Sequence, residues 1–173
     1  MKNLGKKELI ILLIAILVFL SSIGFFVTKT IINNSKPSVY YRTYTKEDGW
    51  SKWAKNGEVC GNDHYITALQ IKVKTHEYGF VKYNVLTNDW LKTDKSTNEV
   101  AGNKKDIVKG TRIKITDNLA KKYKIFYRVT ANTKEWNDYA DGYLRAFYKI
   151  TKNGPEPIKY IQIKIDERWK YDN

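Results

Sequence analysis

The chain has 173 residues and a formal net charge of +13, with 31 Lys and Arg residues against 18 Asp and Glu residues. A single cysteine excludes an intramolecular disulfide framework, and the two histidines fall in no spacing typical of a metal site. The charge surplus favours an anionic partner such as acidic polysaccharide, phosphate-bearing polymer, lipid headgroups or nucleic acid, although solubilising lysines on strand faces would produce the same surplus.

The chain begins with a long apolar segment. Residues 9–27 carry no charge, and residues 1–8 contain three lysines and one glutamate. An apolar helix of roughly 20 residues spans a bilayer, and a positively charged flank stays in the cytoplasm. We therefore expect a cytoplasmic N-terminus over residues 1–8, a transmembrane anchor over residues 9–27, and a single-pass cell-membrane protein with an extracellular C-terminal domain. A signal peptide is the alternative, with bulky Phe25 and Phe26 placed unfavourably for cleavage.

A short polar linker follows, over residues 28–38. Residues 39–173 suit the usual size of one domain. Residues 1–36 hold five lysines and one glutamate, so a net charge of +9 remains for the rest of the chain. Most of the positive charge is therefore expected on the C-terminal domain.

One pattern occurs three times in residues 39–173. Its first tyrosine is Tyr41, Tyr83 or Tyr127, and these stand 42 and 44 positions apart. Such a period indicates a repeated supersecondary unit, so we expect repeats over about residues 39–78, 79–122 and 123–168. The matching positions that follow each tyrosine are Trp50, Trp90 and Trp136, then the closing segments 70–73, 112–115 and 162–165.

Each repeat begins and ends with alternating apolar and polar residues. Residues 69–73 show this alternation clearly, and it is typical of half-buried strands. Turn signals such as Asp48-Gly49 and Asn56-Gly57 separate the strands. The sequence predicts an all-β domain that follows the N-terminal helix, either a pseudo-threefold β-prism-like fold or a β-trefoil. In both folds the three repeated tryptophans would be packing residues.

The first repeat also matches a known family pattern between Tyr40 and Val73. The matching residues are Tyr41-Arg42-Thr43, Gly49-Trp50, Trp53, Asn56-Gly57, Gly61, Ala68 and Ile71. In these residues the repeat resembles the clostridial hydrophobic repeat with conserved tryptophan, the ChW repeat. The later repeats match less well, since Trp90 and Trp136 lack the preceding glycine. The resemblance implies a surface or secreted adhesion module of a clostridial-type Gram-positive bacterium, without established catalytic residues.

No group of residues points to catalysis. His64 and His76 have no counterparts in the other repeats, and carboxylates such as Asp48 and Asp63 lie in turns, where hydrogen bonds to the backbone explain them. Only two carboxylates brought together by the fold, as in a glycosidase, would change this interpretation. We expect no enzyme, no catalytic residue, no metal site and no cofactor.

Two sets of residues suit ligand binding. The first is Trp53 with the turn residues Asn62, Asp63 and Tyr65, since exposed aromatic rings stack on sugars. The alternative, which is favoured for each ring taken singly, is that the rings fill gaps between sheets. The second contains repeated cations at outward strand positions, where arginine can bind carboxylate or phosphate. This second set comprises Arg42 and Arg128 with a basic stripe of Lys72, Arg112, Lys114 and Lys164.

These features predict a membrane-anchored extracellular module that binds carbohydrate or an anionic cell-wall polymer. The alternative is an envelope subunit that docks a partner protein and has no affinity for glycans. Nucleic acid is a weaker candidate, because the aromatic residues do not cluster along one basic stripe.

Overall fold

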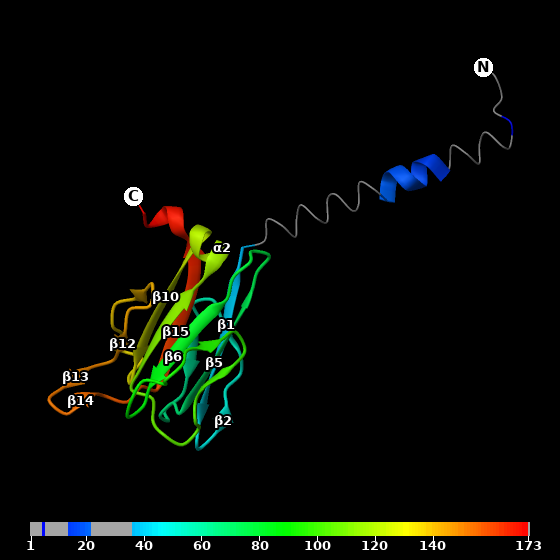
Figure 1. Cartoon of the computed structure of the whole chain (residues 1–173). Coiled ribbons are helices and arrows are strands. Elements are labelled where there is room, and N and C mark those ends of the chain that lie inside the picture. Colours follow the sequence, from blue (N-terminus) through cyan, green and yellow to red (C-terminus); the bar gives the residue numbers. More distant parts are fainter. Residues whose placement is uncertain (1–4, 6–13, 22–35, 173) are drawn as a thin grey trace. The chain divides into compact units, whose positions relative to one another are not determined.

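The computed structural model describes residue 5, residues 14–21 and residues 36–172, and the chain divides into two units, Met1–Lys36 and Pro37–Asn173. In the first unit residues 14–21 are helical, and the Ser21 hydroxyl donates a hydrogen bond of 2.8 Å to the carbonyl oxygen of Val18. The second unit consists mainly of strands (Figure 1). The all-β prediction for this unit is confirmed.

The predicted transmembrane helix and the single-pass membrane location need correction. In the part of the chain that the structure describes, no helix has both the length and the hydrophobicity needed to cross a membrane. Of the predicted span, residues 9–13 and 22–27 lie outside the described residues. An uncharged apolar run provides hydrophobicity, but crossing also requires one continuous helix of roughly 20 residues. The predicted fold class is a β-prism-like domain preceded by a transmembrane helix. The transmembrane helix is the part of that prediction that is wrong.

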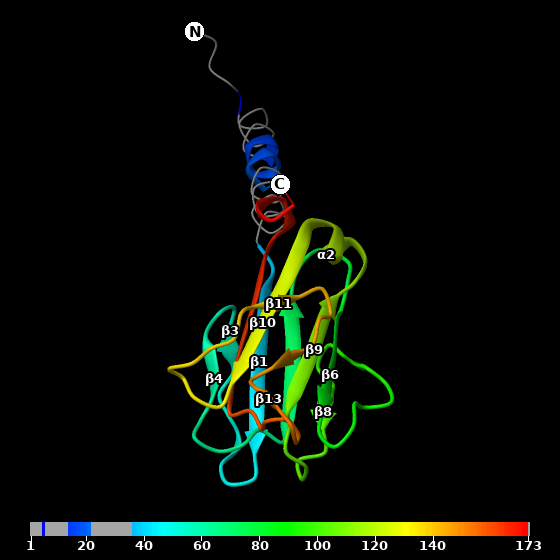
Figure 2. The same cartoon turned by 90° about the vertical axis from the view of Figure 1, so that its left-hand side faces the viewer.

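Three large sheets, each centred on one long antiparallel hairpin, form the strand unit (Figure 2). The first and last strands of each repeat pair along most of their length. The hairpins are β1 (Ser38–Thr45) with β5 (Ala68–Lys74) in sheet A, β10 (Tyr123–Thr130) with β15 (Tyr160–Glu167) in sheet B, and β6 (Val81–Leu86) with β9 (Gly110–Ile115) in sheet C.

Short strands extend the sheets and link the repeats. Three of them pair with the first strand of their own hairpin: β3 (Ala54–Lys55), β7 (Lys95–Ser96) and β11 (Ala140–Asp141). Three others pair with the closing strand of the preceding repeat in a cyclic order: β4 (Val59–Gly61) with β15, β8 (Val100–Gly102) with β5, and β12 (Ala146–Phe147) with β9. The three sheets stay open and no closed barrel forms among the described strands, so the barrel of a β-trefoil is absent there.

The remaining elements are short. They are β2 (Gly49–Trp50) on the edge of β1, the ribbon of β13 (Ile150–Thr151) and β14 (Gly154–Pro155), the helix α2 (Asp117–Lys122), and the 3-10 turn η1 (Arg168–Lys170). Helix α2 falls between the second and third hairpins, and η1 follows the third.

All three sheets bury one face in a common core. The repeated tyrosines Tyr41, Tyr83 and Tyr127 are fully buried there, and each hydroxyl donates a hydrogen bond to a backbone carbonyl of its own repeat. The Tyr83 hydroxyl also accepts a hydrogen bond of 3.1 Å from the N–H of Ile71 in sheet A. A buried hydroxyl with both partners in place joins one repeat to the preceding one, which explains why the tyrosine recurs.

Close approach between repeats requires a glycine where β4 pairs with β15 and where β8 pairs with β5. A Cβ on Gly61 would lie 2.0 Å from the Lys159 oxygen, and one on Gly102 would lie 2.5 Å from the Thr67 oxygen. In the third repeat the equivalent position is Phe147, and the glycine stands opposite it as Gly110. In the third repeat the space for close approach is therefore provided by the glycine of β9 and not by β12.

Candidate functional site

The outer face of each sheet carries an arginine that contacts two aromatic rings, an arrangement that we call an aromatic–cation stack. In sheet A the guanidinium of Arg42 lies 4.4 Å from the ring centre of Trp50 and 4.7 Å from that of Trp53. The ammonium of Lys72 continues the stack at 4.0 Å from the Trp53 ring. All four side chains are half-buried, and contacts of this kind stabilise a fold by about 0.5–2 kcal/mol each.

Sheet B repeats the arrangement. Arg128 lies 4.7 Å from the Trp136 ring and 4.6 Å from the Tyr139 ring, and Lys164 lies 4.6 Å from Tyr139. Each tryptophan therefore packs against an arginine on the outer face rather than in the core. Trp53 and Tyr139 both stand three positions after the repeated tryptophan of their own repeat.

In sheets A and B a glutamine holds the arginine in place. The Arg42 Nε donates to Gln70 at 2.8 Å, and the Arg128 Nε donates to Gln162 at 2.7 Å. Both pairs face each other across neighbouring strands. The predicted ligand arginines Arg42 and Arg128 thus use part of their hydrogen-bonding capacity inside the protein.

Sheet C differs, because its arginine lies on the closing strand and the polar residue opposite lies on the first strand, the reverse of sheets A and B. Arg112 stands on β9, opposite Asn84 on β6. Asn84 is fully buried and bonds to both backbone groups of Leu91 and to the Asp94 carboxylate, each at 3.0 Å. The buried Nε of Arg112 has no hydrogen-bond partner in the described part of the chain, and its guanidinium approaches Asp94 at 3.6 Å.

A second difference concerns the residue that pairs with the lysine of each aromatic–cation stack, which is Lys72, Lys164 or Lys114. In sheet A this residue is Tyr40, whose ring lies 5.6 Å from the Lys72 ammonium, and in sheet B it is Phe126 beside Lys164 at 5.3 Å. In sheet C the residue opposite Lys114 is Lys82. An aromatic ring that would shield the cation is therefore replaced by a second positive charge.

The third difference is which repeat supplies the second aromatic ring that packs on the arginine. The second repeat has Thr93 three positions after Trp90, and Tyr143 of the third repeat supplies the ring instead, 4.7 Å from Arg112 and 4.4 Å from Lys114. Tyr143 has a φ of 81°, in the left-handed region that bulky residues rarely adopt. Its N–H donates to the Ile113 oxygen at 3.1 Å, so the turn is fixed by the sheet that it covers.

These differences open a pocket of about 650 Å³ on sheet C, which we call the basic pocket. Four cationic side chains reach it, and Asp94 is the one carboxylate among the residues that line it. The lining residues are Phe80, Lys82, Lys92, Thr93, Asp94, Ser96, Arg112, Lys114 and Tyr143. The pocket is therefore strongly positive.

Asp94 is already engaged by its neighbours. Burial acts to raise the pKa of its carboxyl group, but hydrogen bonds from Asn84 and Tyr143 and the charges of Arg112 and Lys114 outweigh burial, so the pKa lies below its ordinary value. Burial, with the hydrogen bond to Asp94, raises the pKa of Tyr143 to about 12. At neutral pH the carboxylate is therefore charged and the phenol is neutral.

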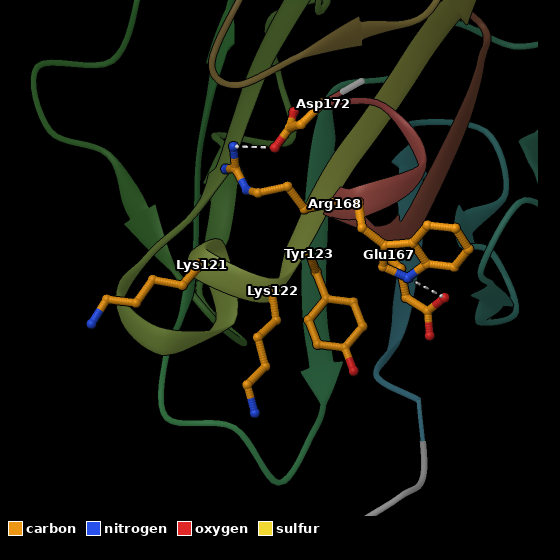
Figure 3. A pocket seen from close by; sticks show the side chains of 7 residues that line it. Lys121, Lys122, Tyr123, Glu167, Arg168 and Asp172 are labelled. Carbon is orange, nitrogen blue, oxygen red and sulfur yellow. Dashed lines mark hydrogen bonds and ion pairs between the residues drawn. The ribbon is translucent and has the colours of Figure 1, made fainter.

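Another pocket, of about 460 Å³, lies between α2 and η1 (Figure 3). Its charges are largely paired: Arg168 lies 3.4 Å from Asp172, with their side chains pointing toward one another in Figure 3, and Lys122 bonds to Glu77 at 2.6 Å. This pocket therefore offers an anionic ligand less unpaired positive charge than the basic pocket does.

The structure separates the predicted ligand residues. Trp53 belongs to the stack of sheet A, whereas Asn62 donates to Asp48 at 2.8 Å and Asp63 accepts from Tyr160 at 2.8 Å. Tyr65 is 43% exposed, and the Lys159 ammonium lies 5.1 Å from the centre of its ring. Among the described residues, no hydrogen bond, ion pair or cation–ring contact links Asn62, Asp63 or Tyr65 to Trp53.

The basic stripe is likewise divided among three sheets. Lys72 lies on sheet A and Lys164 on sheet B, and only Arg112 and Lys114 reach the basic pocket. Sequence reasoning missed Lys82, Lys92 and Asp94. One signal was available: the residue before the repeated tyrosine is Tyr40 or Phe126 in two repeats and Lys82 in the other.

In comparisons with known proteins the chain matches no protein-family model, no curated protein and no solved structure.

Proposed function

We propose that the strand unit binds an anionic carbohydrate or wall polymer at the basic pocket. The observation that carries the proposal is the direct pairing of Lys82 with Lys114 across two neighbouring strands. Side chains in this relation have Cβ atoms about 4.5–5.5 Å apart, and like charges there destabilise a sheet. The described residues provide no acidic partner for Lys82. A bound anion would relieve this repulsion.

Arg112 supports the same proposal. Its guanidinium is planar and held between the rings of Trp90 and Tyr143, so little side-chain freedom remains to be lost on binding. Arginine binds carboxylate and phosphate groups with two parallel hydrogen bonds. A ligand group in the basic pocket would therefore meet a preoriented guanidinium beside two lysines.

A carbohydrate rather than a simple anion is favoured by the shape of the site. Phe80 is 42% exposed at the wall of the basic pocket and offers an apolar surface for a sugar ring. The pocket is open, which suits a group within a chain.

The experiment is binding of the full chain to immobilised anionic polysaccharides, a phosphodiester-linked glycan, a neutral dextran and duplex DNA, at two salt concentrations. We expect salt-sensitive binding to anionic glycans and a loss of about tenfold or more in Lys82→Gln and Lys114→Gln. Lys46→Gln, in the turn after β1, and Lys55→Gln, in β3 of sheet A, remove the same charge from exposed positions and serve as matched controls.

Equal losses in the controls, or no binding to any anionic glycan, would overturn the proposal. A single dominant protein adduct after crosslinking in cells, without glycan binding, would instead favour the protein-docking alternative.

A further inference from the structure

A second pocket adjoins the basic pocket. It has a volume of about 530 Å³, and we call it the aromatic pocket. Phe80 and Ser96 line both pockets. The other residues that line the aromatic pocket are Val73, Thr75, Glu77, Tyr78, Gly79, Thr97 and Asn98. The two pockets therefore share part of their wall, at Phe80 and Ser96.

Two aromatic rings stand exposed in the aromatic pocket. Tyr78 is 65% exposed and Phe80 is 42% exposed, and their ring centres lie 5.7 Å apart in an edge-to-face arrangement. Such exposure of two neighbouring rings leaves apolar surface in water unless a ligand covers it. Sugar rings present C–H faces that pack on surfaces of this kind.

The backbone that carries these rings is firmly held. The Phe80 N–H donates to the Thr116 hydroxyl at 3.1 Å, and the Leu119 N–H donates to the Tyr78 carbonyl at 3.0 Å. Gly79 lies so close to α2 that a Cβ there would stand 2.4 Å from the Thr116 oxygen. The rings are thus presented by a fixed segment, which lowers the entropic cost of binding.

The polar groups of the aromatic pocket suit hydroxyl groups rather than charges. Its one carboxylate, Glu77, is paired with Lys122 at 2.6 Å. The side-chain amide of Asn98 makes no hydrogen bond within the described part of the chain, although its backbone bonds to Ile71 and Gln70. An amide offers donors and an acceptor to sugar hydroxyls.

We infer that the ligand is a polymer whose anionic group occupies the basic pocket while an adjacent sugar ring packs on Tyr78 and Phe80 in the aromatic pocket. This inference rests on the proposed function. It adds the second subsite and the ligand class, an anionic sugar chain of at least two units. A single charged sugar in the basic pocket leaves the Tyr78 ring uncovered.

The test is calorimetric titration of the full chain with galacturonate of one, two and four units, and with phosphodiester-linked sugar oligomers of the same lengths. We expect the affinity for one of these series to rise about tenfold or more from one unit to four. Tyr78→Ala should lower the affinity for the four-unit ligand about tenfold and leave that for the single unit unchanged, because Tyr78 lines the aromatic pocket alone. Phe80→Ala should lower the affinity for both ligands, because Phe80 lines both pockets. Lys82→Gln should lower both.

Tyr65→Ala and Trp169→Ala remove exposed rings elsewhere and serve as controls, and the melting temperature verifies that each variant folds. Equal affinity for all lengths, or unchanged binding in the Tyr78 and Phe80 variants, would overturn the second subsite. The proposed function would survive that result if Lys82→Gln still weakened binding. Absence of binding at every length in both series would overturn both.

Discussion

The N–H of Ile71 donates a hydrogen bond of 3.1 Å to the buried hydroxyl of Tyr83, and this contact joins the second repeat to the first. The Tyr83 hydroxyl in turn donates to the carbonyl of Glu99 in its own repeat. One side chain thus satisfies two backbone groups that come from different parts of the chain.

Replacement of Tyr83 by Phe should destabilise the protein. It leaves the Ile71 N–H without a partner in the core, which costs about 1–3 kcal/mol. Urea denaturation measures the change in the free energy of unfolding. Tyr65→Phe, at an exposed ring, should change it by less than about 0.5 kcal/mol. Similar values for the two variants would contradict a linking role for Tyr83.

Alkaline pH should unfold the protein by ionising the buried tyrosines. Burial raises the pKa of Tyr83 from 10.0 to about 12 and raises those of Tyr41 and Tyr127 as well. The folded state therefore holds the phenolic proton more tightly than the unfolded state does. The stability that this contributes is fully present below pH 10 and is lost as the pH rises through the folded pKa values. Each such tyrosine should lower stability by about 1.4 kcal/mol per pH unit in that window.

The matched measurement for alkaline unfolding uses Tyr83→Phe, which has no phenol to ionise. Its free energy of unfolding should fall less steeply above pH 10 than that of the unmodified protein. Parallel curves for the two proteins would show that Tyr83 does not contribute.

Replacement of Arg42 by Lys should destabilise sheet A although the charge is kept. Lysine lacks the planar group that contacts Trp50 and Trp53 and the Nε that donates to Gln70. We expect a loss of about 1–2 kcal/mol in thermal or urea unfolding, with a change in tryptophan fluorescence. Arg145→Lys, at an exposed residue 5.6 Å from the Trp90 ring, is the control and should be nearly neutral.

Two glycine substitutions should differ because only one site lacks space. Gly102 and Gly142 both have positive φ angles, of 101° and 55°. A Cβ on Gly102 would lie 2.5 Å from the Thr67 oxygen, whereas one on Gly142 would meet nothing within 4 Å. Gly142→Ala should therefore lower the free energy of unfolding by about 1 kcal/mol. Gly102→Ala should lower it by more than about 3 kcal/mol or prevent folding. Equal melting temperatures would contradict the tight contact between β8 and β5.

Replacement of Asp94 by Asn should strengthen anion binding several-fold, because it removes the one carboxylate that lines the basic pocket. The pKa of Asp94 is below its ordinary value of 3.8, so the wild-type carboxylate stays charged at pH 5 and the difference should persist there. The stability that Asp94 contributes should be lost only as the pH falls through that lowered pKa. Weaker glycan binding by Asp94→Asn at pH 5 and pH 7 would contradict this role.

The sequence by itself determined the strand pattern and the recurrence of one tyrosine in each repeat. Alternation with a period of two is local, so the closing segments could be recognised as strands before any pairing was known. The pattern of Tyr41, Tyr83 and Tyr127 likewise needed no tertiary information, and all three are buried. Hydropathy predicts a transmembrane helix over residues 9–27, whereas no helix in the described part of the chain is long and apolar enough to cross a membrane.

Only the tertiary structure decided which outer face differs from the other two. The basic pocket depends on Lys82 standing opposite Lys114 and on Tyr143 crossing from the third repeat to cover the second. The first relation arises from strand pairing and the second from a turn that bonds to β9, and both join residues distant in the chain. A one-residue change of register would place every side chain on the other face, so a local pattern cannot specify which charges meet.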